Sequence, residues 1–569
     1  MIADPFRSHE GMNQGGKKSW WALGLIITVT LLVFSQSFDF DYVDYDDPAY
    51  VSGNPYVNQG LTAKSLRWAW TYAPDPIAEE SLHPGVTNLW HPLTWISHMI
   101  DVQCWGANSP GRHHMSSVLL HLGSAVLVFL LFGRLFDSLW VGSFTALLFA
   151  IHPLQVEAVA WISGRKDQLS AFFMFASLYS YLRISAAKHR RARLWKGLSV
   201  SLYAMALCSK PSVVVMPALL VLIDYQRVGQ GLVIHGGPGN SIRGVFRGII
   251  RLLREKWLWI VPAVIVAAVT LITQQGGSHA FWIERSNLID RVLLFGPAVC
   301  YYILRCLVPV NLSFHYSCPA WVMQGWVILG CFLVVAGVLL ICYRSRTKTP
   351  QAWFACLWFM VLIVPVSGMA YVGTSFTSDR YMYTTLTGVF AALAYGLSRF
   401  PLRTSYLAGS VIIAVLVPLS FIQTTHWRDS KALFTHAIEV QPKDKVGYVN
   451  MGSLHQREGR YPQAITCYET VIQMVRHDYI SWFNLGNCRN KTGDPLGAID
   501  AYRSSLKIFP HYNPSRFNLA YLLLNPNTSY HDLDEATHLL KSIRKSGSYR
   551  GSKVDLLLSV AADLKRQRG

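Results

Sequence analysis

The sequence predicts an all-α protein, with a polytopic transmembrane helical bundle of about 11–13 spans followed by a short α-solenoid. Hydrophobic residues make up 51% of the 569 residues, which is high for a soluble protein. Uncharged apolar runs recur from Trp20 to Gln423, and many approach the roughly 17–25 residues that a helix needs to cross a bilayer. Beyond Thr425 these runs stop and an internal period begins. We therefore expect a membrane domain over residues 19–425 and a solenoid over residues 426–569.

Twelve windows of the membrane domain are candidate spans: 19–38, 114–133, 138–152, 168–185, 196–209, 211–225, 257–274, 290–308, 325–342, 352–367, 382–397 and 405–423. The first resembles an uncleaved signal anchor, because Lys17 and Lys18 precede it and no small-residue cleavage site follows. Residues 1–18 are then a cytoplasmic tail. Twelve crossings from that tail would end inside, whereas the basic links at 343–348 and 399–403 require an odd total that ends outside. One window between 196 and 308 is therefore re-entrant, in-plane or miscounted.

The formal net charge of +19 is explained by topology rather than by nucleic-acid binding. The basic residues gather in short links between apolar runs, such as "AAKHRRARLWK" at 186–196, where the positive-inside rule places them in the cytoplasm. The loop over residues 39–112 is the opposite case, with nine acids and three Lys or Arg. We expect this first loop to lie outside, and we expect no nucleic-acid partner.

The C-terminal region repeats every 34 residues. "YVNMGSLHQREGRYPQAITCYETVI" aligns with "SWFNLGNCRNKTGDPLGAIDAYRSSL", so that Gly452, Ala464 and Tyr468 recur as Gly486, Ala498 and Tyr502. Small residues where two helices cross, followed by an aromatic residue, are the tetratricopeptide pattern. We expect repeats at about 445–478 and 479–512, a partial repeat at 513–546, a half-unit at 427–442 and a capping helix at about 551–566. Such a short solenoid is more often a docking or rigidifying element than a catalytic one.

The first loop opens with "DFDYVDYDDPAYV", which places five acids directly after the first span. An acidic solvated loop would follow from topology alone. Pro48 stiffens the turn after Asp46 and Asp47, however, and the interleaved tyrosines suit a wall that contacts lipid, sugar or peptide. Such a carboxylate pair can act as a general base for a hydroxyl nucleophile, hold a metal, or do both.

Further charges lie at predicted outer ends of spans: Glu157, Arg165, Lys166, Asp167, Lys210, Asp379 and Arg380. Charges this close to the hydrocarbon are costly and are usually paired or functional. The simpler interpretation is local ion pairing, of Arg165 with Asp167 or of Asp379 with Arg380. The alternative is that cations from separate loops converge on an anion, for which a lipid phosphate is the natural substrate group.

The histidines and cysteines give little further indication of function. His91, His98, His113, His114 and His121 lie close in sequence, and spacings of about seven residues place pairs on one helical face. A metal site is possible there, but no tight metal-ligand motif is present, and interfacial hydrogen bonding or a role for His91 near an acceptor is favoured. The ten cysteines contain no CxxC pair, and most lie in apolar runs.

Several segments follow one another in a specific order: "DYDDPAYVSGNPYV", "LWHPLTWISHMIDVQCWGANSPGRHH", "HPLQVEAVAWISGRKDQLS", "LCSKP", "PVNLSFHY" and "SDRYMYT". With the C-terminal repeats, they resemble the transmembrane and tetratricopeptide repeat O-mannosyltransferases over nearly the whole chain. "WISGRKD" and "HPLTWISHMID" are more similar to the bacterial branch than to the animal one. Lys166 and the pair Ser378-Asp379 depart from the residues usual in relatives, which leaves the donor sugar open.

The resemblance implies a GT-C glycosyltransferase that moves a sugar, mannose or a similar one, with inversion from a polyprenyl phosphate to a hydroxyl acceptor. Asp46 or Asp47 would be the base, with Asp47 slightly favoured because Pro48 fixes the backbone beside it. Arg165, Arg380, Lys210, Lys166 and Tyr381 would bind the donor phosphate, and His91, Glu157, Asp167, Asp379 and Tyr45 would support the site or contact the acceptor. No metal or other cofactor is required, because cations neutralise the leaving phosphate.

Other functions remain open at this point. Within the enzyme class, an oligosaccharide transferase or a glycolipid-modifying enzyme is the alternative. Outside it, the repeats suit a non-catalytic membrane scaffold, whereas a transporter would place its charges at mid-membrane. The expected partners are a lipid-linked sugar and an acceptor protein or glycan, docked by the repeats. The expected location is a bacterial inner membrane with the repeats in the periplasm, or the ER membrane with luminal repeats.

Overall fold

The computed structural model describes residues 16–71, 90–229, 242–274, 288–367, 375–526, 528–546 and 549–568. Among these residues the secondary structure is helical and contains no β-strand; two residues, Tyr316 and Thr377, form an isolated bridge. The chain divides into two compact units, Met1–Leu433 and Phe434–Gly569. The prediction of a membrane helical bundle followed by a tetratricopeptide solenoid is confirmed. The predicted tail, residues 1–18, and residues 72–89 of the first loop lie largely outside the described residues.

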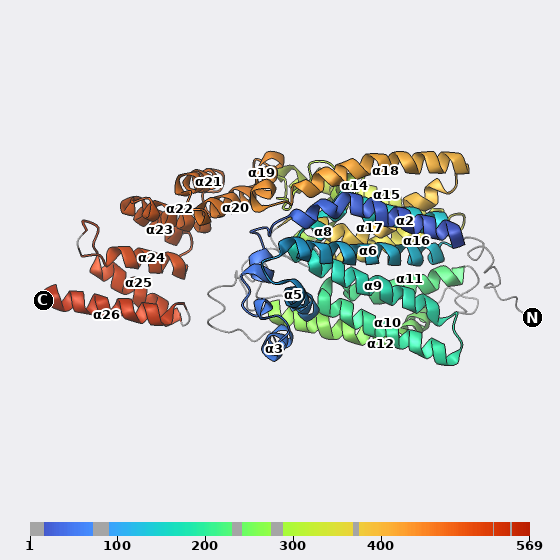
Figure 1. The fold of residues 1–569 in the computed structure, drawn as a ribbon, viewed down its shortest axis with the longest axis horizontal. Coiled ribbons are helices and arrows are strands. Elements are labelled where there is room, and N and C mark those ends of the chain that lie inside the picture. Colours follow the sequence, from blue (N-terminus) through green and yellow to red (C-terminus); the bar gives the residue numbers. More distant parts are fainter. Residues whose placement is uncertain are drawn as a thin grey trace, which may run out of the picture. The chain divides into compact units, whose positions relative to one another are not determined.

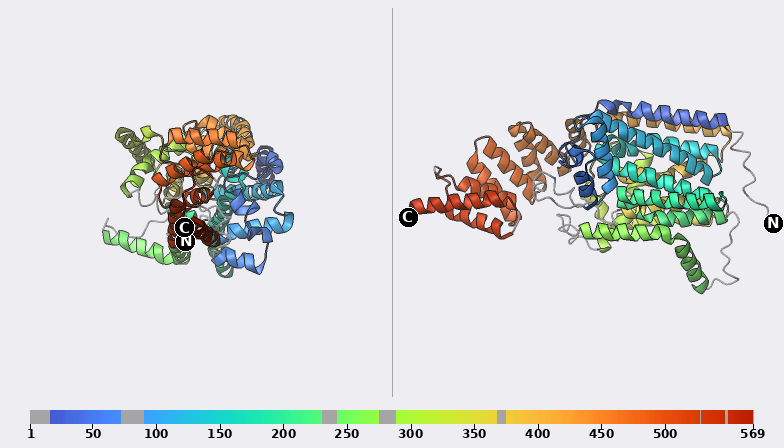
Figure 2. Two further views of the ribbon diagram at one scale, coloured as in Figure 1. Left: turned by 90° about the vertical axis from the view of Figure 1, so that its left-hand side faces the viewer. Right: turned by 60° about the horizontal axis from the view of Figure 1, so that its bottom comes forward.

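The first unit is a bundle of helices that lie side by side (Figures 1 and 2). Each of the twelve predicted windows overlaps one of its helices: α2 (Gly16–Phe34), α6 (Pro110–Leu135), α7 (Leu139–Ile151), α9 (Arg165–Ile184), α10 (His189–Ser209), α11 (Met216–Gly229), α12 (Ile242–Gln274), α14 (Leu288–Leu307), α15 (Gly325–Arg344), α16 (Pro350–Ile363), α17 (Met382–Leu397) and α18 (Leu402–Thr425). The apolar composition of each window was sufficient to locate its helix, because a helix satisfies its own backbone in lipid.

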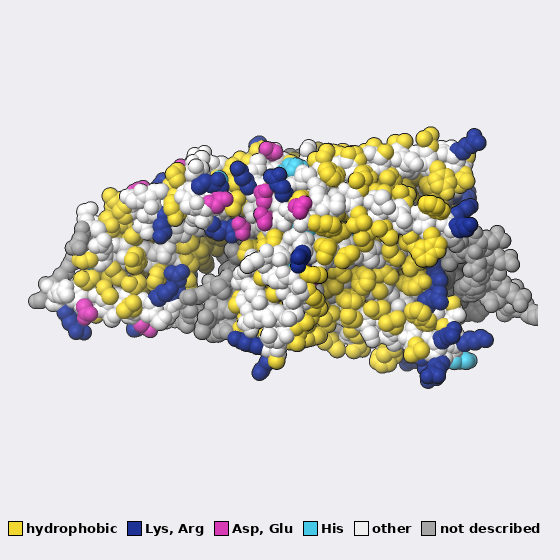
Figure 3. Space-filling view, viewed as in Figure 1, with side chains coloured by type: hydrophobic (Ala, Val, Ile, Leu, Met, Phe, Trp, Pro, Cys, Tyr) yellow, Lys and Arg dark blue, Asp and Glu magenta, His cyan; other side chains and the backbone are white. Residues whose placement is uncertain are grey.

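The surface of this unit fits a membrane. Within the described residues, five helices are long and apolar enough to cross a bilayer alone (α2, α6, α12, α15 and α18), and α7 with α8 (Val156–Ala160) makes a sixth if this pair, bent by 60°, is one span. Large apolar side chains such as Leu333 and Val411 are more than half exposed. Figure 3 shows a mostly hydrophobic face over the bundle, with Lys and Arg gathered at one end. The protein is an integral membrane protein.

The directions of the helices bear on the number of crossings. α2 and α18 run parallel, because the side chain of Gln36 donates to the carbonyl oxygen of Phe421 and the backbone N–H of Asp41 donates to that of Arg428. The first and last helices therefore end on one side, which requires an odd number of crossings. α12 packs against the short helix η6 (Pro211–Val215) at this same end, and α14 ends there too, since the carbonyl oxygen of Cys306 bonds His152. α12 and α14 together thus contribute one net crossing.

Short helices and loops close the end of the bundle where α2 and α18 end. This end, called the site end below, contains η1 (Ser35–Asp39), η2 (Pro48–Ser52), η3 (Val57–Gln59), α3 (Ala63–Thr71) and α5 (Pro92–Trp105). A buried aromatic core joins them, in which Tyr50 stacks on Trp95 and Tyr56 stacks on Trp68. The described part of the first loop is therefore a layer with a buried aromatic core rather than a fully solvated loop.

The second unit is built from antiparallel helix pairs, which follow one another in Figure 1. Its helices are α20 (Lys445–Arg457), α21 (Tyr461–Met474), α22 (Tyr479–Lys491), α23 (Pro495–Ile508), α24 (Asn513–Leu523), α25 (Leu533–Ser546) and α26 (Gly551–Arg568); α19 (Ser430–Val440) leads into them from the first unit. Gly486 lies so close to Tyr502 that a Cβ would be 2.6 Å from the ring, and Gly452 meets Tyr468 in the same way. The repeating glycine thus lets α20 cross α21, and α22 cross α23, at close distance.

Candidate functional site

The segment between α7 and α9 carries most of the predicted site residues. Pro153 follows His152 and stops α7, after which the chain forms η4 (Pro153–Gln155), α8 and η5 (Ile162–Gly164) before α9 begins. Gly164 is required at the last turn, because a Cβ there would lie 2.7 Å from the carbonyl oxygen of Ala158. Every residue of this segment is buried. The sharp turns bring Glu157, from α8, to the same end of the bundle as the first residues of α9.

The two acids of the first loop have different surroundings. Asp47 is fully buried; its Oδ1 accepts hydrogen bonds from the Ser163 N–H at 2.9 Å and the Ser163 hydroxyl at 2.5 Å, and its Oδ2 accepts one from the Val43 N–H at 2.9 Å. Burial raises the pKa of Asp47 to about 6, although these three bonds favour the ionised form. The side chain of Asp46 is 29% exposed, and its Oδ2 lies 3.9 Å from the Nζ of Lys166. Asp47 thus ties the loop to η5, while Asp46 remains accessible.

Three cations surround two aromatic rings beside Asp46. The Nζ of Lys166 lies 4.9 Å from the ring centre of Trp161, and the guanidinium of Arg380 lies 5.2 Å from it. The ring of Tyr381 has Arg380 at 5.1 Å and the Nζ of Lys210 at 5.3 Å. The three side chains are only 10–16% exposed. They come from α9, from the residue before η6 and from the short helix η9 (Asp379–Tyr381).

Each of these cations faces an acid. Arg380 binds Glu157 twice, from its Nη1 to Oε1 at 2.5 Å and from its backbone N–H to Oε2 at 2.9 Å. Lys210 forms an ion pair with Asp167. We call this group the charged cluster: Asp46, Glu157, Lys166, Asp167, Lys210 and Arg380. It contains three cations and three acids, so that its formal charge is balanced before any substrate enters.

The two local ion pairs considered from the sequence do not form. Arg165 binds the Oδ2 of Asp101 through Nη1 at 2.8 Å, the Ser117 hydroxyl through Nε at 3.1 Å and the His113 carbonyl oxygen through Nη2 at 2.8 Å. Its side chain is only 1% exposed. The guanidinium is therefore engaged with α5 and α6 and does not line the charged cluster.

Asp379 also turns away from Arg380. Its Oδ2 accepts a hydrogen bond from the hydroxyl of Tyr316 at 2.9 Å, and burial raises its pKa. The same hydroxyl accepts a bond at 2.7 Å from Arg305, whose guanidinium lies over the Tyr316 ring. These contacts hold η9 and therefore fix the position of Arg380.

Tyr45 and His91 lie at the edges of the cluster. The ring of Tyr45 packs against Trp161 and Phe314, and burial raises the pKa of its phenol. His91 stacks on Tyr50 and Trp95. Burial lowers its pKa well below the ordinary value, with smaller contributions from Lys166 and Lys210, so the imidazole is neutral at pH 7. Its Nε2 has no hydrogen-bond partner among the described residues.

Sequence reasoning missed three residues that shape the site: Asp101, Trp161 and Arg305. Trp161 stands in the quoted "WISGRKD" but was considered only as part of that motif. Asp101 lies in α5 and forms an ion pair with Arg165 of α9, whereas Arg305 lies in α14 and bonds Tyr316, which is 11 residues along the chain. For Arg305 the available signal was a charge within the predicted span 290–308, since such charges are usually paired or functional.

Comparisons with known proteins agree with this architecture. A family described as Dolichyl-phosphate-mannose-protein mannosyltransferase matches residues 111–229, and a Tetratricopeptide repeat family matches residues 449–513. Protein O-mannosyl-transferase TMTC4 of Homo sapiens is 23% identical over 520 residues, covering 79% of this chain and 66% of that protein. Protein O-mannosyl-transferase TMTC3 of Homo sapiens is 21% identical over 469 residues, covering 78% and 50%. The chain thus spans about half to two thirds of the length of these curated relatives.

Among solved structures, the apo crystal structure of the Archaeoglobus fulgidus oligosaccharyltransferase is similar over 73% of this chain and 56% of that chain, at 12% identity and a TM-score of 0.34.

The family matches cover one segment of the membrane unit and one of the repeat unit, and the relatives match through both. The order of motifs from the first loop to "SDRYMYT" adds to these matches. The chain is therefore similar to the transmembrane and tetratricopeptide repeat O-mannosyltransferases in both of its units.

Proposed function

We propose that this protein is an inverting glycosyltransferase that moves a sugar, mannose or a similar one, from a polyprenyl phosphate to the hydroxyl group of an acceptor, a protein Ser or Thr. One observation carries the proposal: an accessible carboxylate, Asp46, lies beside three nearly buried cations at the site end of a membrane bundle. A hydroxyl acceptor needs a base, and a leaving phosphate needs positive charge, so this arrangement provides both.

The reaction assigns a role to each side of the cluster. The acceptor oxygen attacks the anomeric carbon, the bond from that carbon to the phosphate oxygen breaks, and Asp46 takes the hydroxyl proton. Lys166, Lys210 and Arg380 stabilise the negative charge that develops on the departing polyprenyl phosphate. Because Asp47 is enclosed by its three donors, it serves as the support that fixes Asp46 rather than as the base. His91, being neutral, can accept or donate one hydrogen bond to a sugar or acceptor hydroxyl.

The proposed transfer takes place on the outer face of the membrane. Basic residues gather in the links at 186–196, 343–348 and 399–403, and α2 and α18 both end at the opposite side of the bundle, where the charged cluster lies. The positive-inside rule then assigns the site end to the periplasm, or to the ER lumen in a eukaryotic cell. A lipid-linked sugar reaches such a site from within the membrane.

A reconstituted assay tests the function directly. Purified full-length protein in vesicles is given a radiolabelled polyprenyl-phosphate sugar and an extract of periplasmic proteins, and labelled protein is measured. We expect label on Ser or Thr of proteins and release of the polyprenyl phosphate. Label only on lipid would indicate a glycolipid-modifying enzyme, and no transfer with any polyprenyl-phosphate sugar would favour a non-catalytic scaffold.

We further propose that the repeats dock the acceptor. The second unit contains a cavity of about 390 Å³, lined by Gln456, Tyr461, Asn487, Asn490, Lys491, Tyr502, Phe517, Asn518 and Tyr521. Asn487 uses its side-chain oxygen to accept bonds from Tyr502 and Asn518, so that its amide N–H groups remain available. Amide groups, tyrosines and one ammonium group can bind the alternating donors and acceptors of an extended peptide.

Removing two exposed side chains of this cavity tests the docking proposal. The variant Asn490→Ala/Lys491→Ala is expected to raise the KM for a folded acceptor protein several-fold, with kcat and the donor KM unchanged, because docking energy is lost but the cluster is intact. Lys507→Ala, an exposed lysine of α23 outside the cavity, is the matched control. An unchanged acceptor KM in the double variant would remove the cavity from the proposal.

A further inference from the structure

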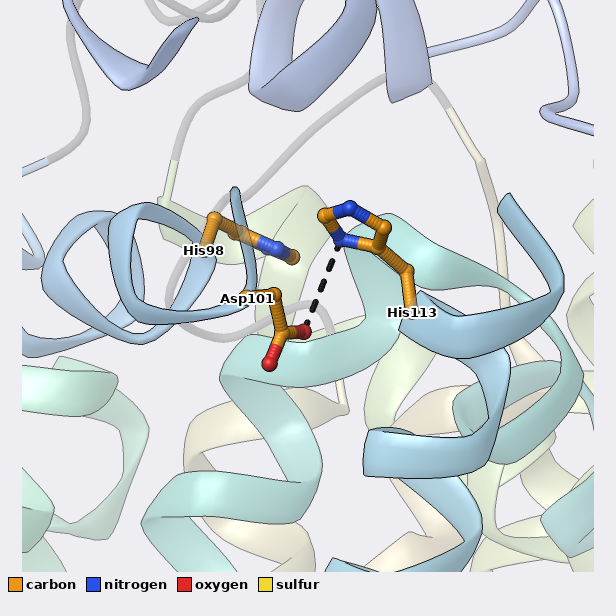
Figure 4. A group of neighbouring side chains, drawn as sticks. All are labelled: His98, Asp101 and His113. Atoms are coloured by element: carbon orange, nitrogen blue, oxygen red, sulfur yellow. Dashed lines mark ion pairs between the residues drawn. The ribbon is translucent and has the colours of Figure 1, made fainter. Parts of the chain in front are cut away.

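Three side chains of α5 and α6 place possible metal ligands together. One ligand atom from each of His98, Asp101 and His113 lies within 4.8 Å of the others, and all three residues are buried. His98 and Asp101 stand on α5, one turn apart, and His113 stands in the first turn of α6. Figure 4 shows the two imidazoles on either side of the Asp101 carboxylate.

The hydrogen bonding of His113 leaves a lone pair facing a carboxylate. Its Nε2 lies 3.2 Å from the carbonyl oxygen of Gly106, and a carbonyl can only accept, so Nε2 carries the hydrogen. In the neutral ring Nδ1 is then an acceptor, yet it lies 3.5 Å from the Oδ2 of Asp101, which is also an acceptor. Two acceptors at this distance repel unless a cation lies between them. A backbone carbonyl that fixes the tautomer in this way is the usual partner of a metal-ligating histidine.

His98 provides the second unpartnered group. It is completely buried, and neither ring nitrogen has a hydrogen-bond partner among the described residues. Burying an imidazole without partners is unfavourable, because both nitrogens lose their bonds to water. If His98 were the third ligand of a bound metal, the metal would satisfy one of its two ring nitrogens.

Asp101 is already held as a metal-binding carboxylate usually is. Its Oδ1 accepts from the Ser116 hydroxyl at 2.9 Å, and its Oδ2 forms an ion pair with the Nη1 of Arg165 at 2.8 Å. Bonds of this kind orient ligating carboxylates. Two ligand atoms bound to one tetrahedral zinc ion at about 2.0–2.1 Å are about 3.3 Å apart, close to the separation of Asp101 and His113.

We propose that His98, Asp101 and His113 bind one divalent first-row transition metal, with zinc favoured by the two imidazoles and one carboxylate. The metal joins α5 to α6 and, through Asp101, to Arg165 at the start of α9. Its role is structural, because none of the three ligands belongs to the charged cluster. The proposal does not depend on the proposed transferase activity.

Metal analysis of the full-length, tag-free protein in detergent tests this proposal. After incubation with zinc and desalting, we expect about one zinc per chain in the wild type and almost none in His98→Leu. His114→Gln is the matched control: His114 is also fully buried, one residue from His113, but its Nε2 bonds the Asp41 carbonyl oxygen and it is no member of the group. This variant should bind zinc as the wild type does.

Thermal unfolding gives a second readout that remains informative if a variant folds poorly. A chelator should lower the unfolding temperature of the wild type, zinc should restore it, and His98→Leu should respond to neither. If the site instead holds only a protonated His113 beside Asp101, the wild type will contain no zinc and ignore the chelator. His98→Leu will then be as stable as the wild type or more so, because leucine replaces an unpartnered imidazole. Either result would overturn the metal site.

Discussion

Replacing Asp46 by asparagine is expected to lower sugar transfer about 10²–10⁴-fold, because asparagine cannot take the acceptor proton. The protein should still fold, since Asp46 is partly exposed and its nearest cation, the Nζ of Lys166, is 3.9 Å away. Donor binding should change little. The measurement is transfer from a polyprenyl-phosphate sugar in reconstituted vesicles, together with the thermal unfolding temperature of the variant.

Asp47→Asn is the informative comparison, because it should affect stability first. The three groups that bond Asp47 are all donors, so an asparagine would turn its amide N–H groups toward at least one of them. An unsatisfied buried donor costs about 1–3 kcal/mol. We expect a lower unfolding temperature, with transfer reduced in proportion to the loss of folded protein.

The pH dependence of stability separates the two acids further. A carboxyl group with a pKa raised from 3.8 to about 6 by folding stabilises the fold fully below the lower value. That contribution to the free energy of unfolding is lost as pH rises through about 6, because ionisation in the buried site is costly. As pH rises through this value, the wild type should therefore lose stability relative to Asp47→Asn. The variant Asp46→Asn keeps the Asp47 carboxyl group, so its stability should change with pH as that of the wild type does. If Asp46→Asn transfers at a near-normal rate, Asp46 is not the base.

The sequence predicted the helices well because apolar composition alone decides where a membrane helix forms. The number of crossings was harder, because α14 adds no net crossing beyond that of α12, and nothing in its composition distinguishes a full crossing from a partial one. The predicted repeats begin where the helix pairs begin, at Lys445, Tyr479 and Asn513. In the first two repeats the 34-residue period reflects a glycine that must meet an aromatic ring, Gly452 with Tyr468 and Gly486 with Tyr502.

The pairing of charges could not be read from the sequence. Arg165, Lys166 and Asp167 are adjacent, but successive residues of a helix point about 100° apart. They therefore face Asp101, Asp46 and Lys210, which come from three different segments. Proximity along the chain suggested pairs that helical geometry does not allow, and the actual partners required the tertiary structure.

The different burial of Asp46 and Asp47 could not be predicted from the sequence for a related reason. Both stand in one turn before Pro48, so local sequence treats them alike. Only the packing of the loop on Ser163 buries one carboxylate and leaves the other accessible. The sequence placed both acids in one turn, and the structure leaves the carboxylate of Asp46 more accessible than that of Asp47.

The second large effect is expected at Arg380. In Arg380→Ala, Glu157 is left almost fully buried without its cation, which costs about 3–5 kcal/mol, and the cluster loses the guanidinium proposed to bind the donor phosphate. Arg380→Lys should recover only part of donor binding, because an ammonium group cannot form the paired bonds of a guanidinium. Donor affinity and the thermal unfolding temperature are measured for each variant.

The double variant Arg380→Ala/Glu157→Gln separates these two losses. Glutamine removes the stranded charge, and its side-chain oxygen can still accept the backbone N–H of residue 380, so the fold should recover most of its stability. Donor binding and transfer should remain low, because no cation has been returned to the phosphate. Arg428→Ala, which removes an exposed guanidinium paired with Asp429, should change neither quantity, since exposed ion pairs contribute about 0–1 kcal/mol. If the double variant regains both stability and normal transfer, Arg380 acts only by neutralising Glu157, and Lys166 and Lys210 alone would bind the phosphate.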